Sequence, residues 1–412
     1  MDIRLLDPQS PTWVAELDRL YAQLGGADNP LLFPYHFLQA TFPRIGGRLA
    51  ISLAQGEAVA VGLLFPRRFA QQQRIYTLRY HALRDLTPLS AQEFAMKLAA
   101  ILGCPPLAPY IPEHPHHFAP THELIGSVDM GWPDATEAAQ IRQLQQQIWG
   151  STPEFLYPVD MHSLEFGLGT SLVARVEDKT AGFLFGFYKF GESTLPIDWS
   201  EKFNGGWRLE SQILGVLPAY RGMRLAFLLK KVQAENALQQ GIQLINWTVD
   251  PLQYPNAALN FGMLGAVAFD FTPDYYPFRN ELNRVPASRF SLTWLAGSLR
   301  VRDRLAINVR TTIVDLHRQS AILRVNDRWR RVDETIDAPL IAIEIPANWT
   351  ALQQEDLDEA LRWRAATDTL FQRYIGRNVG QYVVTGAGVD GDRRFLIAEQ
   401  ANQALWEHLG QT

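Results

Sequence analysis

The sequence has little cysteine and no long apolar run, and both absences narrow what the chain can be. Cys104 is the single cysteine among 412 residues. It cannot form an intrachain disulfide or a thiolate metal cluster, so a reducing compartment is expected. No apolar run reaches the length that spans a membrane, and the first residues lack the apolar segment of a signal peptide. These features predict a cytoplasmic protein with no membrane partner.

An excess of basic charge is also missing. The net charge is −5, which argues against a general nucleic-acid binder. An anionic ligand must therefore be attracted by a local basic patch. The composition, 47% hydrophobic and 20% charged, is that of a globular protein, and the length predicts two or three domains.

One such patch lies in the middle of the chain, between residues 211 and 234, where four basic residues and no acidic residue occur. Residues 213–217 form an apolar run that predicts a buried strand, and Pro218 ends it. After a short turn, leucines recur at helical spacing from Leu225 onward. The first N–H groups of a helix lack intrahelical partners and lie at its positive end. This strand–turn–helix is therefore expected to bind a diphosphate.

The first region, residues 1–118, has the predicted order helix, helix, three strands, helix. No phosphate-binding turn follows its third strand. Ser90 is the expected N-cap of the last helix, because Glu93 stands three residues later. The predicted elements cover residues 11–24, 33–42, 48–54, 58–65, 74–80 and 90–102.

A proline-rich stretch, residues 105–120, closes this region and holds His114, His116 and His117. One interpretation is a metal site, and the other is a stiff polar connector. The connector is favoured because the histidine spacing matches no metal motif, and because the prolines prevent the helix that would align the ligands.

The central region, residues 119–299, has the predicted order helix, three strands, helix, strand, helix, two strands. The turn Glu177-Asp178-Lys179 is expected between the first two strands, and the last two strands are expected to pair. The third region, residues 300–412, is predicted as strand 340–345, helix 352–374 and a hairpin of 381–385 with 394–398. These are the elements that the first region lacks. We therefore hypothesise that the first and third regions jointly build a second copy of the central fold.

The turn of the central region resembles the acyl-CoA loop of the GNAT superfamily of CoA-dependent N-acyltransferases. The family pattern is Arg or Gln, two residues, Gly, one residue, then Gly or Ala, and the matching stretch is Arg221-Gly-Met-Arg-Leu-Ala226. Arg224 occupies the position of the middle glycine. A series of further stretches is similar to a narrower group of GNAT-like proteins, some of them associated with N-acylamino-acid racemases: 245–252, 256–260, 264–266, 273–277, 286–290 with Trp294, and 343–349.

The resemblance implies an α/β fold with a mixed α+β sheet and a GNAT-like central domain. The second, degenerate GNAT-like half is the hypothesis drawn above from the element order of the first and third regions. It implies acyl-CoA, as acetyl-CoA or succinyl-CoA, as the co-substrate, with no metal. The backbone from Arg221 through Gly222, Met223, Arg224 and Leu225 to Ala226 would hold the diphosphate. Leu214 and Val216 would polarise the thioester through their N–H groups.

Two alternatives stay open at this turn. It can be an ordinary strand–turn–helix connection with no ligand. The Arg224 side chain can obstruct the diphosphate, or it can turn outward and pair with a phosphate.

Candidates for the general base are Asp250, at the end of a strand, and Glu210, on the strand before the loop. Their structural alternatives are a turn cap for Asp250 and an exposed strand position for Glu210. The tyrosine that serves as general acid in many superfamily members corresponds to Phe261 here, so Tyr275 or Tyr276 would replace it unless both only pack beside prolines.

Three further residues are candidates for binding the acceptor. Asn256 and Asn260 lie four apart on a predicted helix and so share a face. Arg289 can pair with a carboxylate. The structural alternatives are a helix N-cap for Asn256 and a surface or structural ion pair for Arg289.

The predicted function is transfer of an acetyl or succinyl group from CoA to a primary amine, such as an amino acid. Attack would be direct, because Cys104 is far from the motif. The rival is a decayed GNAT-like scaffold that acts as a binding or assembly module. The assembly is left open, with a homodimer as the alternative to a single chain.

Overall fold

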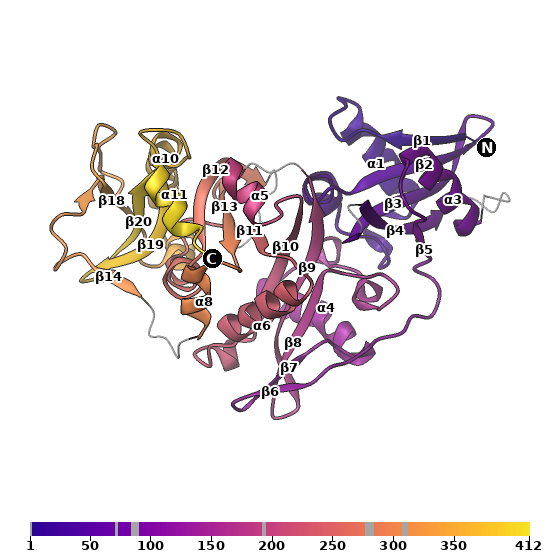
Figure 1. Ribbon diagram of the computed structural model, residues 1–412, viewed down its shortest axis with the longest axis horizontal. Coiled ribbons are helices and arrows are strands. Elements are labelled where there is room, and N and C mark those ends of the chain that lie inside the picture. The colour runs from indigo at the N-terminus through magenta and orange to yellow at the C-terminus, as the bar shows by residue number, and fades with distance from the viewer. Residues whose placement is uncertain (1, 71–72, 84–89, 192–194, 277–283, 307–311) are drawn as a thin grey trace. The chain divides into compact units, whose positions relative to one another are not determined.

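The computed structural model (Figure 1) describes residues 2–70, 73–83, 90–191, 195–276, 284–306 and 312–412. Contacts divide the chain into two compact units. The first comprises Met1–Ser193 with Gly206–Asn236, and the second comprises Thr194–Gly205 with Ala237–Thr412. Helices and strands mix in both units, and parallel and antiparallel pairs mix in their sheets. The predicted α/β class with mixed sheets is confirmed, while the division into regions 1–118, 119–299 and 300–412 stays a prediction.

The first unit begins with a five-stranded sheet in the order β1-β2-β3-β4-β5. All neighbours are antiparallel except β4 and β5, which run parallel because α3 connects them. The three predicted strands and the Ser90–Glu93 capping box are confirmed, whereas β1 was not anticipated. The elements are β1 (Asp2–Leu6), α1 (Trp13–Gln23), α2 (Phe42–Arg44), β2 (Arg48–Ala54), β3 (Glu57–Ala70), β4 (Gln73–Ala82), α3 (Ala91–Leu102) and β5 (Ala108–Tyr110).

The predicted helix over residues 33–42 is irregular. A π-helical turn, Phe37–Thr41, precedes the short α2. Phe33, Phe37 and Phe42 are fully buried against Phe65 of β3 and Phe187 of β9 (Lys179–Phe190). Packing against this aromatic core determines the conformation of residues 33–42, and their local sequence pattern alone does not.

The second sheet of the first unit has the order β10-β9-β8-β7-β6. The predicted turn between β8 and β9 is confirmed: Glu177 and Asp178 both have positive φ, the conformation of a two-residue hairpin turn. The elements are β6 (Glu123–Ile125), β7 (Val128–Gly131), α4 (Ala135–Trp149), β8 (Thr170–Val176), β9, β10 (Trp207–Val216) and α6 (Leu225–Gln239).

The second unit contains a sheet with the order β15-β18-β20-β19-β12-β13-β11, and β14 pairs with β19. Its strands are β11 (Leu244–Val249), β12 (Val267–Tyr276), β13 (Ala287–Leu295), β14 (Ile313–Asp315), β15 (Leu323–Arg324), β18 (Leu340–Ile345), β19 (Tyr382–Asp390) and β20 (Arg393–Gln400); β16 (Asn326–Asp327) and β17 (Arg331–Val332) pair separately. Its helices are α5 (Ile197–Lys202), α7 (Tyr254–Ala257), α8 (Leu299–Ala306), α9 (Trp349–Glu355), α10 (Leu357–Tyr374) and α11 (Gln403–Leu409).

Two trios of strands in this sheet repeat one arrangement. The first trio is β11-β13-β12 and the second is β18-β20-β19, each with a helix between its first two strands in sequence. The trios meet where Ala268 of β12 pairs with Val384 of β19. The third region thus repeats the end of the central fold on the same sheet. Among the described residues, the strands of the first region form a separate sheet and pair only with one another. The hypothesis that the first and third regions jointly build one second copy is therefore wrong.

The predicted helix 352–374 is split. Asp356 ends α9 and caps α10, where its side chain accepts the N–H of Glu359. Among the described residues, no helix is both long and apolar enough to cross a membrane. Pro277, the last residue of the 273–277 stretch, lies outside the described part of the chain.

Candidate functional site

The β10–α6 connection has the predicted strand–turn–helix form, and Figure 1 labels both elements. A short 3₁₀ turn, Pro218–Tyr220, follows β10, and α6 starts at Leu225. The first N–H that bonds back within the helix is that of Leu228, to the carbonyl of Arg224 at 3.0 Å. The N–H groups of residues 225–227 therefore have no intrahelical acceptor, and they lie at the positive end of a 15-residue helix.

The backbone of this turn passes twice through the left-handed region. Gly222 has φ 90° and Arg224 has φ 59°. Such a φ costs a non-glycine residue about 1 kcal/mol. Arg224 thus keeps the backbone of a glycine, the residue that the family pattern has here, and its guanidinium lies 4.9 Å from the centre of the Phe227 ring.

The strand before the turn is distorted. The register of β10 against β9 shifts between Ser211 and Ile213, which marks a β-bulge at Gln212. Beyond the bulge, Leu214 and Val216 pair opposite Leu184 and Gly182, and both are half-buried.

The end of β10 is also tightly packed. A Cβ on Gly215 would lie 2.8 Å from Phe183 and 2.9 Å from Ile148 and Trp149. Packing against α4 and β9 therefore holds this end of β10 in place.

Glu210 is not exposed on its strand. It is buried, and its carboxylate pairs with Arg44 at 2.7 Å and with Lys189 at 3.1 Å. Burial by itself raises the pKa of Glu210, but Arg44 and Lys189 outweigh burial, so the pKa lies below its ordinary value. The carboxylate is stable as an anion in this structure, and the sequence carries no local signal for its pairing with Arg44.

Asp250 ends β11 in the second unit and is surrounded by donors. Arg364 Nη2 donates to both carboxylate oxygens, at 2.9 and 2.7 Å, and Trp349 Nε1 donates at 3.1 Å. The N–H of Leu252 bonds to Oδ1 at 3.0 Å, which makes the predicted turn cap, and Arg289 lies at 3.5 Å. Burial alone would raise the pKa of Asp250. The guanidinium groups of Arg364 and Arg289 lower it by more than burial raises it, so the pKa lies below its ordinary value.

The other predicted acceptor residues also lie in the second unit, but they are dispersed. Asn256 is exposed on α7, whereas Asn260 is buried in the π-helical turn Ala258–Met263 that follows it. The π-helical turn changes the number of residues per turn, so Asn256 and Asn260, four residues apart, do not lie on the same face. Because α7 begins at Tyr254, Asn256 lies within the helix and is not its N-cap.

The aromatic residues at the end of β12 pack on one another and on Arg289. Tyr275 meets Tyr276 edge-on at 4.8 Å, and Arg289 lies 5.0 Å from the centre of the Tyr276 ring. Phe261, which the sequence resemblance places where many GNAT enzymes have a tyrosine, is buried.

The sequence analysis did not predict the residues of the third region that surround Asp250, which are Arg364 and, beside it, Asp368. Asp368 of α10 accepts a hydrogen bond from Ser288 Oγ at 2.7 Å, and Arg364 Nη1 lies 3.8 Å from its other oxygen, which has no hydrogen-bond partner among the described residues. Burial raises the pKa of Asp368 to about 6. A signal existed: Arg364 occupies the apolar stripe of α10 together with Ala360, Trp363 and Phe371, and a charge on such a stripe indicates a buried ion pair.

No protein-family model matches the chain, and no curated protein matches it. Solved structures are similar to about two fifths of it. Naa50 of Arabidopsis thaliana, in complex with the bisubstrate analogue CoA-Ac-MVNAL, is 17% identical with a TM-score of 0.32 over 40% of this chain and 97% of its own. An acetyltransferase of the GNAT family from Streptococcus pneumoniae is 14% identical with a TM-score of 0.32, over 41% and 99%. YncA of Salmonella typhimurium, a putative acetyltransferase with its cofactor acetyl-CoA, is 13% identical with a TM-score of 0.31, over 42% and 95%.

Proposed function

We propose that this chain transfers an acyl group from acyl-CoA to a primary amine. The observation that supports the proposal most is the turn before α6. Two left-handed residues, Gly222 and Arg224, lead into N–H groups that have no intrahelical acceptor. A CoA diphosphate matches such a site in charge and in hydrogen bonding.

Arg224 is compatible with this role. Its backbone has the left-handed φ of a glycine, and its guanidinium stacks on Phe227 of the first helical turn. Arg221 adds a second cation to the same turn, where it can pair with phosphate oxygens. We therefore favour accommodation of the diphosphate over obstruction, with Met223, Leu225 and Ala226 contributing backbone only.

The proposed chemistry is direct attack. The amine nitrogen bonds to the thioester carbon, the carbon–sulfur bond breaks, and CoA leaves as the thiolate that takes up a proton. Leu214 and Val216 are the proposed N–H donors to the thioester oxygen, a role that contributes several kcal/mol in comparable sites. Burial raises the pKa of the Cys104 thiol, which disfavours a covalent cysteine intermediate.

The acceptor ammonium must lose a proton to a base. Asp250 and Glu210 stay candidates, but their lowered pKa values make both weak bases. Tyr275 is the proposed acid, and the proposed acceptor-binding residues are Asn256, Asn260 and Arg289.

The finer assignment follows the sequence resemblance. We propose an amino acid as the acceptor and acetyl-CoA or succinyl-CoA as the donor, in the group associated with N-acylamino-acid racemases. We also propose a cytoplasmic location and keep the homodimer as the alternative assembly.

Calorimetric titration of CoA into the full chain tests the cofactor. We expect binding by the wild type and by Arg224→Gly, and loss of binding by Ala226→Glu, which places a carboxylate at the helix start. Lys231→Ala is the matched control, because Lys231 lies later on α6 and pairs with Glu235. Absence of binding by both the wild type and Arg224→Gly would remove the CoA proposal.

The rival function is a binding module without catalysis. The ion pairs of Glu210 and Asp250 favour it, since neither carboxylate is available as a strong base. Release of free thiol from acetyl-CoA and succinyl-CoA over an amino-acid panel separates the two functions. Thiol release that depends on one acceptor supports the transferase, whereas CoA binding without release on any acceptor supports the module.

A further inference from the structure

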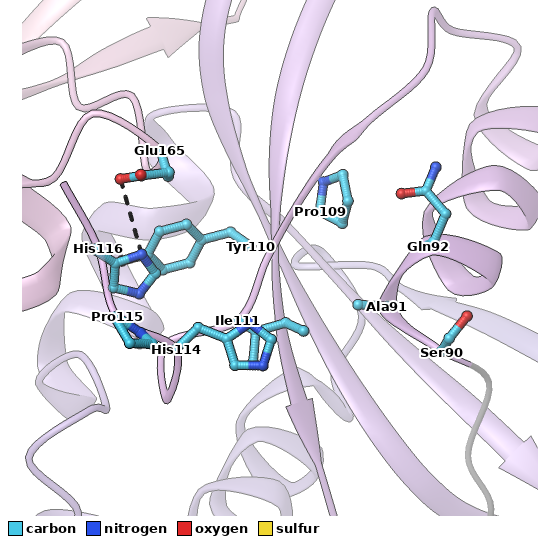
Figure 2. Close-up of a pocket in the computed structure, with 10 residues that line it drawn as sticks. All are labelled: Ser90, Ala91, Gln92, Pro109, Tyr110, Ile111, His114, Pro115, His116 and Glu165. Carbon is cyan, nitrogen blue, oxygen red and sulfur yellow. Dashed lines mark ion pairs between the residues drawn. The ribbon is translucent and has the colours of Figure 1, made fainter.

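Two histidines of the proline-rich stretch, His114 and His116, line a cavity of about 400 Å³ in the first unit. His116 and Glu165 face each other there at 3.9 Å, on the other side of Tyr110 from Ser90 at the start of α3 (Figure 2). Within the described ranges, no group of three or more histidine, cysteine or acidic side chains is arranged to hold a metal ion. The charged groups of this cavity are therefore separated from its helix start.

A cavity of about 450 Å³ in the second unit differs, because a guanidinium and a carboxylate stand together in its wall. It lies beside the point where β12 and β19 pair, at Ala268 and Val384. The register of β12 against β13 shifts between Ala268 and Asp270, which marks a β-bulge at Phe269. Residues 269–271 face the connection between α10 and β19 across the cavity, and Arg377 of that connection donates to Asp270.

Arg377 is held in place and still keeps donors for a ligand. Its guanidinium lies 5.4 Å from the centre of the Phe269 ring, which packs edge-on against Trp199 at 6.0 Å and Trp406 at 5.4 Å. Its Nη2 donates to Asp270, and its other N–H groups have no partner among the described residues. The side chain is 33% exposed, so these donors are accessible from the cavity that it lines.

Gln381 adds an amide to the same wall. Its Oε1 accepts the N–H of Asn378 at 3.0 Å, and its Nε2 has no partner in the part of the chain that the structure describes. A Cβ on Gly376 would overlap the Gln381 amide, so glycine is needed there for the amide to keep this position. The cavity thus offers N–H donors from Arg377 and Gln381 and a carboxylate from Asp270.

We propose that this cavity binds a free α-amino acid as its zwitterion. The ligand carboxylate would accept from Arg377 and Gln381, and the ligand ammonium would donate to Asp270, because a carboxylate can accept from more than one donor. The stack on Phe269 sets the position of the guanidinium before a ligand binds, which lowers the entropic cost of binding.

Charge balance selects a zwitterion over other small ligands. The wall holds one cation and one anion, each about one third exposed. A ligand with both charges gives each of them a partner, whereas a phosphate dianion meets the Asp270 carboxylate and a polyamine meets the Arg377 guanidinium. The inference does not depend on acyl transfer, because every lining residue lies in the second unit and none belongs to the β10–α6 turn.

Saturation-transfer difference NMR on the full chain, without CoA, tests the proposal with three probes. L-alanine carries both charges, propionate lacks the ammonium, and ethylamine lacks the carboxylate. Each probe has a methyl group whose signal reports binding. We expect the wild type to bind L-alanine at least about tenfold more tightly than either probe with a single charge, since each lost charge removes a charge-assisted hydrogen bond.

Two variants should change the preference among the probes in opposite directions. Arg377→Met keeps an apolar chain over Phe269, and it should weaken L-alanine binding by about ten- to hundredfold. It should also strengthen ethylamine binding, because Asp270 loses its cation. Asp270→Asn should weaken L-alanine binding by about tenfold and bind propionate at least as tightly as the wild type does. A general loss of structure would weaken all three probes alike.

Arg373→Met is the matched control, because Arg373 is exposed in the last turn of α10 and does not line the cavity. Its binding of L-alanine should equal that of the wild type. The proposal is overturned if L-alanine does not bind, or if propionate or ethylamine binds the wild type as tightly as L-alanine does. It is also overturned if Arg377→Met and Asp270→Asn bind L-alanine as the wild type does, or if they change all three probes alike.

Discussion

The guanidinium of Arg364 donates to both carboxylate oxygens of Asp250, at 2.9 and 2.7 Å, and joins α10 of the third region to the end of β11. The Arg364 side chain is 2% exposed and that of Asp250 is 10% exposed. Loss of one partner of such a pair leaves a charge without compensation in a nearly buried place. The pair therefore ties the appended region to the central fold.

Replacing Arg364 with Met should lower the free energy of unfolding by about 3 kcal/mol, because Asp250 would keep its charge with fewer donors. Arg362→Met is the matched control. Arg362 is exposed on the same helix and stacks on Trp329 at 4.6 Å, so its loss should cost less than about 1 kcal/mol. Urea denaturation of both variants measures the difference, and equal losses would contradict the importance of the pair.

Asp368→Asn should stabilise the protein at pH 7.5. Burial raises the pKa of Asp368 in the folded state to about 6, above its ordinary value of 3.8, so the folded state binds the proton more tightly than the unfolded state. Its stabilising contribution is present below about pH 4 and is lost as pH rises through 6. Asparagine does not ionise, so it avoids this loss, and we expect the free energy of unfolding at pH 7.5 to rise by about 1–2 kcal/mol. This figure allows for the partial exposure of the group to solvent.

Urea denaturation at pH 4 and pH 7.5 checks this expectation. The gain should be present at pH 7.5 and absent at pH 4. Asp303→Asn, at an exposed position of α8, should show no such dependence on pH. A gain of the same size at both pH values would rule out ionisation of Asp368 as its cause.

Sequence periodicity predicted local structure well in this chain. The hairpin at Glu177 and Asp178, the capping box at Ser90 and the β12–β13 pair are all present, because each depends on residues close in sequence. The partners of Glu210 and Asp250 could not be predicted in this way. Arg44 and Arg364 come from distant segments, and no local pattern specifies which segment packs on which strand.

The same limit explains the error about the second copy. Element order correctly indicated that the third region resembles the end of the central fold, but order does not say which sheet edge a strand joins. The contact of Ala268 with Val384 adds the third region to β12, and the sheet formed by β1 to β5 is separate. Tertiary packing determines which sheet the strands of the third region join, and the β-propensities of those strands do not.

Gly215→Ala should destabilise the protein by about 2–3 kcal/mol, since the new methyl group would overlap Phe183, Ile148 and Trp149 in a packed core. Gly206→Ala is the matched control, because nothing lies within 4 Å of its Cβ position and its φ is not positive. Thermal unfolding should show a lower midpoint only for Gly215→Ala. Similar midpoints for both variants would show that the packing against β10 relaxes.

Arg224→Gly should stabilise the protein by about 0.5–1 kcal/mol, because glycine adopts a φ of 59° without the steric cost that arginine bears. Arg221→Gly is the matched control three residues earlier. Arg221 has φ −64°, which any residue adopts, so glycine there only increases the entropy of the unfolded chain and should destabilise by about 0.5–1 kcal/mol. Chemical denaturation without ligand measures both, and opposite signs are expected. The same sign for both variants would mean that the Arg224 side chain contributes more through Phe227 than its backbone costs, and the strain argument for a glycine-like turn would fail.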